Sequence, residues 1–288
     1  MNRPWQLWRD RRGRLSPLRI AALALLLFPL AKVGWDWSAI IHGARPLNDL
    51  IHRAGFWALT VLGLSLAITP FRRIARYGNL LDVRRMLGVG AFCIIVAHVL
   101  LFAADQKFDL GKVAYEISHR WYLIVGGTAW LGLAVLAVTS TDGMVRRLGG
   151  ERWRRLHQIV YGIALLALVH YFQQTKADVT VPIFVASLFG WLFAYRVFAW
   201  WQGRELSTLS LLALALFVSL VTFLGEGVGI GIAYHVSPMR VLNTVFDFDA
   251  GIRPGWQVLA AGLCVVVLDA VRARWNEKPA RARAVAAE

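Results

Sequence analysis

Eight stretches of mostly apolar residues, separated by short polar segments, restrict the fold of this chain more than any other feature of its sequence. A helix rises about 1.5 Å per residue, so about 20 apolar residues cross the hydrocarbon core of a bilayer. The expected spans are residues 20–37, 55–69, 86–104, 121–139, 153–173, 183–201, 206–224 and 256–271. We therefore predict an all-α fold, a polytopic transmembrane helical bundle.

Basic residues predict how the bundle is oriented in the membrane. The formal net charge is +15, and most of the 32 Lys and Arg residues fall at the two termini and in alternate connections. Because cytoplasmic segments of membrane proteins are enriched in Lys and Arg, eight spans with both termini in the cytoplasm are expected. The basic runs flank apolar spans, and this arrangement argues against nucleic-acid binding.

The span pattern also predicts the domain organisation. We divide the chain into a basic cytoplasmic amino terminus (1–17), a six-span core (18–204), two further spans (205–273) and a basic cytoplasmic tail (274–288). A domain has typically at least about 50 residues, which is more than any connection between these spans holds. A catalytic domain that works with this chain is therefore expected on a separate polypeptide.

One glycine-rich segment, GEGVGIG, follows the seventh expected span. A dinucleotide-binding loop needs a strand before it, whereas an apolar helix precedes this segment. We interpret it as a hinge or a re-entrant turn. Glu226 lies within it, and an acidic residue close to the membrane leaves a role in proton transfer open.

Two histidines near the outer ends of parallel-running spans form the main candidate site. An ionisable side chain inside a membrane is costly, so it usually faces the protein interior and serves a function such as metal binding or proton transfer. His98 and His170 lie late in spans of the same direction and hence at similar depth. Taken singly, each can be a core histidine bonded to a backbone group. As a pair, they are predicted to bind a haem iron from both sides.

A third histidine, His157, lies near the cytoplasmic end of the same expected span as His170. Thirteen residues of helix place it about 20 Å away, on a different face, so it does not serve the same iron. Arginines surround this depth, and we call them the cytoplasmic collar: Arg84, Arg85, Arg152, Arg154 and Arg155. The collar can hold haem propionates, a flavin phosphate or acidic lipid headgroups, or it can simply determine topology.

The segments LNDLIHRAGFWALTVLGLSLAITPFRR, VRRMLGVGAFCIIVAHVLLF and LAVTSTDGMVRRLGGERWRRLHQIVYGIALLALVHYF carry a family resemblance. Over about residues 18–202 the chain resembles MsrQ (also called YedZ), the haem-binding membrane subunits of a methionine-sulfoxide reductase system in Gram-negative bacteria. The resemblance implies a six-helix ferric-reductase-like domain in the inner membrane, with haem b and a reported flavin, FMN. It also implies that His98, His157 and His170 are haem-associated, and that the last two spans depart from the family pattern.

These observations together predict an electron-transfer subunit and not a self-sufficient enzyme. The resemblance implies that the electrons pass to a periplasmic molybdopterin-dependent methionine-sulfoxide reductase catalytic subunit. The expected donor is the quinone pool or a cytoplasmic flavin reductase. Two alternatives remain at this point: a stand-alone metal or oxygen reductase, and a proton-coupled transporter that uses its histidines and Glu226.

Overall fold

The computed structural model describes residues 7–9, 13–175, 178–249 and 251–285, with side chains up to residue 275. Parts of the predicted basic amino terminus and basic tail lie outside these residues. Apart from an isolated bridge between Arg9 and Leu15, the regular elements of the described residues are helices. They are α1 (Pro17–Trp35), α2 (Trp37–Ile41), α3 (Pro46–Ile74), the 3-10 helix η1 (Gly78–Leu80), α4 (Leu81–Asp105), α5 (Leu110–His119), α6 (Trp121–Val138), α7 (Asp142–Leu148), α8 (Gly150–His157), α9 (Val160–Gln174), α10 (Thr180–Gln202), α11 (Thr208–Tyr234), α12 (Pro238–Asn243) and α13 (Pro254–Val285).

The predicted all-α fold with eight spans is confirmed for the described residues. Eight helical segments are long and apolar enough to cross a membrane: Pro17–Trp35, Pro46–Ile74, Gly78–Asp105, Trp121–Val138, Gly150–Gln174, Thr180–Gln202, Thr208–Tyr234 and Pro254–Trp275. Only 11% to 39% of each span is buried inside the protein, so most of their apolar surface is available to lipid. The chain is therefore a multi-pass membrane protein.

Three local predictions about these helices are wrong. The second span does not end at Pro70, because α3 continues through this proline to Ile74. The fifth span is not one continuous helix, since a turn at residues 158–159 separates α8 from α9. The glycine-rich segment is neither a hinge nor a re-entrant turn: it forms the last turns of α11, and each of its glycines has helical neighbours on both sides.

The chain divides into two compact units. The first contains residues 1–68 and 79–175, and the second contains residues 69–78 and 176–288. In the first unit α6 packs against α9 and α4, and α1 packs against α4. Its helix ends are set by local capping: the hydroxyl of Ser16 accepts a hydrogen bond from the backbone of Arg19 at the start of α1, and the carboxylate of Asp109 does the same for Lys112 at the start of α5.

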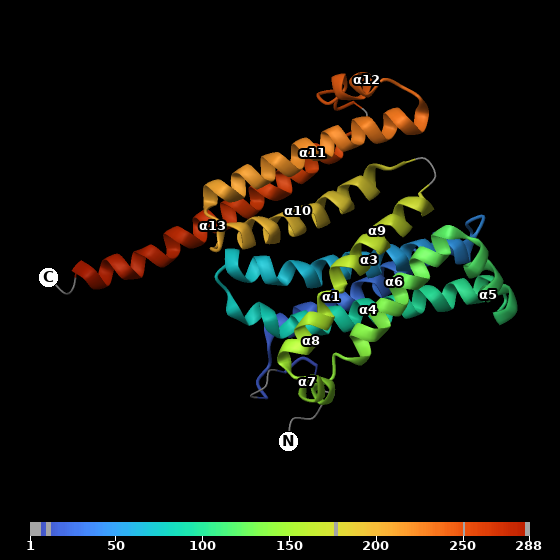
Figure 1. Ribbon diagram of the computed structural model, residues 1–288, viewed down its shortest axis with the longest axis horizontal. Helices are drawn as coiled ribbons and strands as arrows, with labels where there is room; N and C mark the ends of the chain where they lie inside the picture. The colour runs from blue at the N-terminus through green and yellow to red at the C-terminus, as the bar shows by residue number, and fades with distance from the viewer. Residues whose placement is uncertain (1–6, 10–12, 176–177, 250, 286–288) are drawn as a thin grey trace. The chain divides into compact units, whose positions relative to one another are not determined.

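The second unit is built around the contact between α11 and α13, with α10 packed against both (Figure 1). A small residue allows the two backbones to approach, because a Cβ atom added at Gly262 would lie 2.5 Å from the Cβ atom of Ala215. Just before α10, the carboxylate of Asp178 accepts a hydrogen bond from the backbone N–H of Thr180 at 2.9 Å. Hydrogen bonds with the side chain and then with the backbone of Thr180 lower the pKa of the Asp178 carboxyl.

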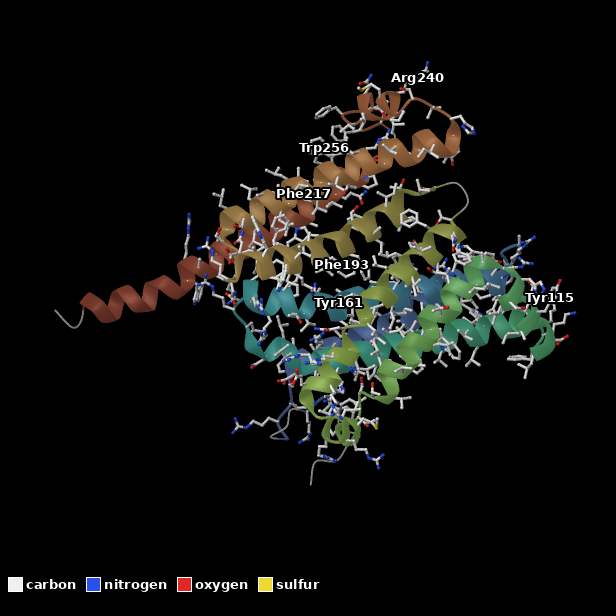
Figure 2. The ribbon with its side chains drawn as sticks, in the orientation of Figure 1. Tyr115, Tyr161, Phe193, Phe217, Arg240 and Trp256 are labelled. Atoms are coloured by element: carbon white, nitrogen blue, oxygen red, sulfur yellow. The ribbon has the colours of Figure 1, made fainter. Side chains whose placement is uncertain are left out.

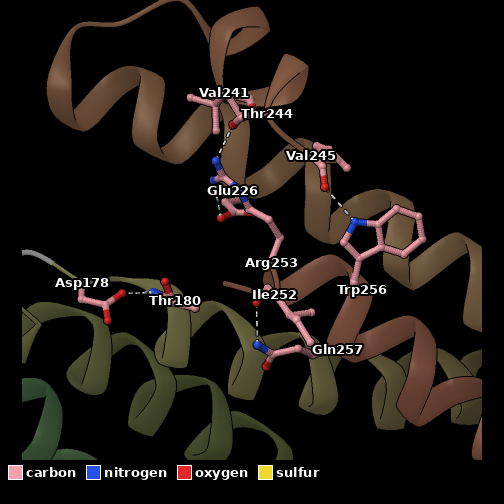
Figure 3. Close-up of polar contacts among 10 residues, drawn as sticks. All are labelled: Asp178, Thr180, Glu226, Val241, Thr244, Val245, Ile252, Arg253, Trp256 and Gln257. Carbon is pink, nitrogen blue, oxygen red and sulfur yellow. Dashed lines mark hydrogen bonds and ion pairs between the residues drawn. The ribbon is translucent and has the colours of Figure 1, made fainter. Parts of the chain in front are cut away.

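An ion pair closes one end of the second unit. Glu226 of α11 is 4% exposed, and Arg253, just before α13, donates to its carboxylate at 3.1 Å (Figure 3). The same guanidinium donates to the hydroxyl of Thr244, and the indole of Trp256 donates to the carbonyl of Val245 at 2.8 Å. Glu226 therefore joins α11 to the segment that follows α12, a structural use of the residue for which the sequence suggested proton transfer.

Candidate functional site

The first unit contains one large cavity, with a volume of about 490 Å³, among α3, α4, α5, α6 and α9. This volume is in the range of cavities that bind cofactor-sized molecules. Its middle is lined by apolar residues such as Leu59, Ile95 and Leu133, and both His98 and His170 open into it. The structure thus brings together the two histidines that the sequence pairs by depth.

The two rings are held in the same way by backbone carbonyls of neighbouring helices. The Nδ1 atom of His98 lies 2.8 Å from the carbonyl oxygen of Ile51, and that of His170 lies 2.8 Å from the carbonyl oxygen of Tyr122. A carbonyl only accepts hydrogen bonds, so Nδ1 carries the proton in each ring. The Nε2 atom of each neutral ring is then left with a lone pair for a metal.

The separation of the rings suits a single metal between them. The ring centres of His98 and His170 are 6.4 Å apart, and the ring planes meet at 88°. Two imidazoles that bind one iron from opposite sides, with bonds of about 2.0–2.1 Å to nitrogen, place their ring centres roughly 6.3 Å apart. The distance between the ring centres is therefore compatible with one iron held between the two rings.

A glycine lies against each ring, one helical turn after the carbonyl that binds it. A Cβ atom added at Gly55 would lie 3.2 Å from Cε1 and Nδ1 of His98, and one added at Gly126 would lie 2.8 Å from the same atoms of His170. Any side chain at these positions would push the ring away from its carbonyl. The site is consequently made of two similar halves, α3 with α4 and α6 with α9.

Charged residues line the end of the cavity that α5 borders. Arg120 donates to the hydroxyl of Tyr122 at 3.0 Å and forms an ion pair with Glu116, and these contacts raise the pKa of Arg120. Lys112 of α5 also lines this end, whereas Tyr115 lies on the exposed surface of α5 (Figure 2). Cations at this end are suited to the carboxylates of an amphiphilic cofactor.

Two buried nitrogen atoms that line the cavity have no hydrogen-bond partner among the described residues: Nε1 of Trp130 and Nε2 of Gln174. Unpaired buried donors are uncommon, because each costs free energy that a bound acceptor would recover. Both are therefore available to a ligand of this cavity.

His157 does not line the cavity and lies at the end of α8. Its Nδ1 atom is 3.1 Å from the carbonyl oxygen of Trp153, its Nε2 atom is 3.3 Å from the hydroxyl of Ser140, and its ring stacks on Trp153 at 3.9 Å. Both ring nitrogens thus have protein partners. No group of three or more His, Cys, Asp or Glu side chains suited to a metal ion occurs among the described residues.

The structure places the collar arginines at the surface. Arg85 forms an ion pair with Asp142, and Arg155 forms one with Glu151. Arg152 and Arg154 are exposed, and Arg84 is half-buried. None of the five lines the large cavity.

Comparison with known proteins identifies the family. The family described as "Ferric reductase like transmembrane component" matches residues 54–168, a range that contains His98 and His157 and ends just before His170. A Rhodospirillum rubrum protein named "Protein-methionine-sulfoxide reductase heme-binding subunit MsrQ" is 41% identical over 190 residues, which cover 66% of this chain and 89% of the relative. The chain belongs to the MsrQ family.

Other MsrQ proteins show the same extent of similarity. Those of Herminiimonas arsenicoxydans and Caulobacter vibrioides are 36% and 38% identical, over 66% and 63% of this chain and 91% and 86% of the relatives. About a third of the chain thus lies outside these MsrQ alignments. No solved structure matches.

Several residues of the site in this MsrQ family member are absent from the sequence-based prediction. Gly55 and Gly126 are two of 25 glycines in the chain, and only their contacts with the rings distinguish them. The carbonyls of Ile51 and Tyr122 are backbone groups, which no residue type reveals. A glycine placed at the depth of a histidine on a neighbouring span is the one signal that the sequence offers for this arrangement.

Proposed function

We propose that this chain is the haem-binding, electron-transferring membrane subunit of a methionine-sulfoxide reductase system. The observation that carries the proposal is the pair formed by His98 and His170, with ring centres 6.4 Å apart across a cavity of about 490 Å³. The names of the MsrQ relatives support it, because they describe haem-binding subunits of such a system. Haem b bound there would supply one-electron transfer.

The residues of the chain prepare this site in three ways. The carbonyls of Ile51 and Tyr122 fix each ring in the tautomer whose Nε2 atom has a free lone pair. Apolar side chains between the helices exclude water and lower the local dielectric. Lys112 and Arg120 at the outer end would bind the propionates, with the side-chain amide of Gln174, one turn after His170, as an additional donor.

The electron path follows from the proposed orientation. With both termini in the cytoplasm, α4 and α9 run outward, and the histidine pair lies toward the periplasmic face of the bacterial inner membrane. The acceptor is then a separate periplasmic subunit, in our proposal the molybdopterin-dependent methionine-sulfoxide reductase. The donor is the quinone pool or a cytoplasmic flavin reductase.

Two parts of the proposal concern the cytoplasmic side. His157 is assigned to a separate haem-associated site, since it lies outside the cavity of His98 and His170. The collar is assigned to FMN, with the phosphate on Arg84 or Arg85 and with Arg154 and Arg155 as further cofactor-binding residues at the same expected depth. Because Arg85 already pairs with Asp142, a phosphate would have to compete with or join this ion pair.

Replacement of both Arg84 and Arg85 by Ala tests the flavin site. The double variant should lose FMN and keep the haem spectrum of the parent. Lys at both positions should restore binding only partly, because an ammonium lacks the bidentate geometry of a guanidinium. Equal flavin content in variant and parent would leave the collar as a determinant of topology.

Reoxidation of the reduced haem tests the function as a whole. The chain would be reduced in detergent, mixed with the periplasmic reductase and a methionine-sulfoxide substrate, and followed by its visible absorption. Reoxidation should be faster with the complete system than with the reductase alone or with buffer. Equal rates would reject this function and favour a stand-alone metal or oxygen reductase. A purified protein without visible absorption would favour the transporter.

A further inference from the structure

A second pocket, of about 340 Å³, lies within the second unit. It is formed where α3 ends, where α10 is followed by α11, and near the end of the α13 span, so residues far apart in the sequence meet in it. Because these are the ends of membrane spans, the pocket lies at the depth of lipid headgroups. We propose that it binds the headgroup of a zwitterionic phospholipid that carries both a phosphate and a primary ammonium, such as phosphatidylethanolamine.

A buried tyrosine at the floor of the pocket indicates that it binds a polar ligand. Tyr195 is 3% exposed and lines the pocket. Its ring is fixed by stacking on Trp191, with ring centres 5.8 Å apart. A tyrosine hydroxyl at the wall of a pocket can donate a hydrogen bond to a ligand oxygen.

The charges around the pocket match a zwitterion. Arg73 and Arg76 contribute two guanidinium groups, and Glu205 and Asp269 contribute two carboxylates. Asp269 is 8% exposed and accepts a hydrogen bond from the hydroxyl of Thr208 at 2.6 Å. The two arginines and Glu205 have no ion pair among the described residues, so their charges are available. Guanidinium groups bind a phosphate, and the carboxylates bind an ammonium.

The same residues argue against other membrane ligands. Only Ile74 and Leu206 among the lining residues are apolar, whereas a quinone ring needs apolar walls. A purely anionic headgroup would face the repulsion of Glu205 and Asp269. A choline headgroup has no N–H to donate to these carboxylates, so phosphatidylethanolamine should bind better than phosphatidylcholine or phosphatidylglycerol.

Native mass spectrometry of the full, delipidated chain tests the site, with dioleoyl lipids of these three headgroups added in equal amounts. Phosphatidylethanolamine should be retained preferentially by the parent. Arg73→Gln and Tyr195→Phe should each reduce its retention about tenfold, the loss expected for a charge-assisted or buried hydrogen bond. Arg204→Gln is the matched control, because Arg204 is exposed nearby and does not line the pocket.

Glu205→Gln tests the part of the site that would bind the ammonium group. Because Glu205 is exposed, removal of its charge should leave the fold intact. This variant should bind phosphatidylglycerol nearly as well as phosphatidylethanolamine. Equal retention of all three lipids by the parent, or unchanged retention in Arg73→Gln, would overturn the proposal. Equally effective competition by water-soluble glycerophosphoethanolamine would overturn the assignment to a lipid. Displacement by a short-chain ubiquinone would overturn it in favour of a quinone.

Discussion

His98 and His170 reach one cavity from two different helices, and each ring is bonded through Nδ1 to a carbonyl that lies one turn before a glycine. The carbonyl precedes its histidine by 47 residues in the first half of the site and by 48 in the second. The two halves therefore repeat the same helix-pair arrangement. The repetition explains how two distant segments present equivalent nitrogen atoms to one position.

The first prediction concerns the histidines themselves. Replacement of His98 or His170 by Ala should abolish the haem or convert it to a high-spin form, because one axial ligand is lost. His157→Ala should leave one low-spin haem, since His157 lies outside the cavity. His119→Ala is a surface control on α5. Optical spectra of the purified variants test this assignment. A normal low-spin haem spectrum in His98→Ala, together with the loss of all haem absorption in His157→Ala, would mean that the pairing of His98 with His170 is wrong.

The second prediction concerns orientation. Reporter fusions that are active only in the periplasm should be active after Lys107 and Asp247 and inactive after Arg76 and Glu151, because basic connections stay in the cytoplasm. Fusions of matched expression level would be compared by reporter activity per cell. An active fusion after Glu151 would reverse the arrangement and place the histidine pair at the cytoplasmic face.

The third prediction concerns an ion-pair network that joins α1 to α3. Lys32 and Arg53 each lie 2.8 Å from the carboxylate of Asp36, and the pKa of this carboxyl is lowered, chiefly by its hydrogen bond with Lys32. A lowered pKa means that the carboxylate stabilises the fold above the ordinary value of 3.8 and that this contribution is lost as the pH falls through the lowered value.

Asp36→Asn should accordingly lower the melting temperature slightly at neutral pH, and the difference from the parent should shrink as the solution is acidified below the ordinary carboxyl value. The effect should also weaken in high salt, because the pair is close to solvent. Asp82→Asn is the control, since Asp82 has no ion pair among the described residues. If the difference in melting temperature between Asp36→Asn and the parent did not change with pH, the charge of the Asp36 carboxylate would contribute nothing to stability.

Much of this fold could be predicted from the sequence, because hydropathy and charge act locally along the chain. The eight spans and the proximity of His98 and His170 follow from counting residues against the thickness of a bilayer. The break before Val160 was not predicted, although it lies where the polar segment that ends at Gln158 meets the apolar run that begins at Ile159. The same applies to the glycine-rich end of α11, whose helix is supported by packing against α12 and α13 and not by its own propensity.

The last prediction concerns the glycines that touch the rings. Gly126→Ala should displace the ring of His170, because the new Cβ atom would lie 2.8 Å from two ring atoms, and overpacking of this kind costs about 1–3 kcal/mol. Gly55→Ala should act in the same direction more weakly, with the corresponding distance 3.2 Å. Haem content and the midpoint potential would be measured for each variant, and both should change.

Gly127→Ala is the matched control for this prediction, because the residue is adjacent to Gly126 on α6 and an added Cβ atom would meet only Ile117, at an ordinary 3.9 Å. Both substitutions add one methyl group and raise helix propensity equally, so a general effect on α6 would appear in both variants. A change in haem content or midpoint potential confined to Gly126→Ala assigns it to the contact with His170. Because Gly127 also lines the cavity, equal behaviour of the two variants would mean that the effect comes from added volume in the cavity wall and not from the contact with His170.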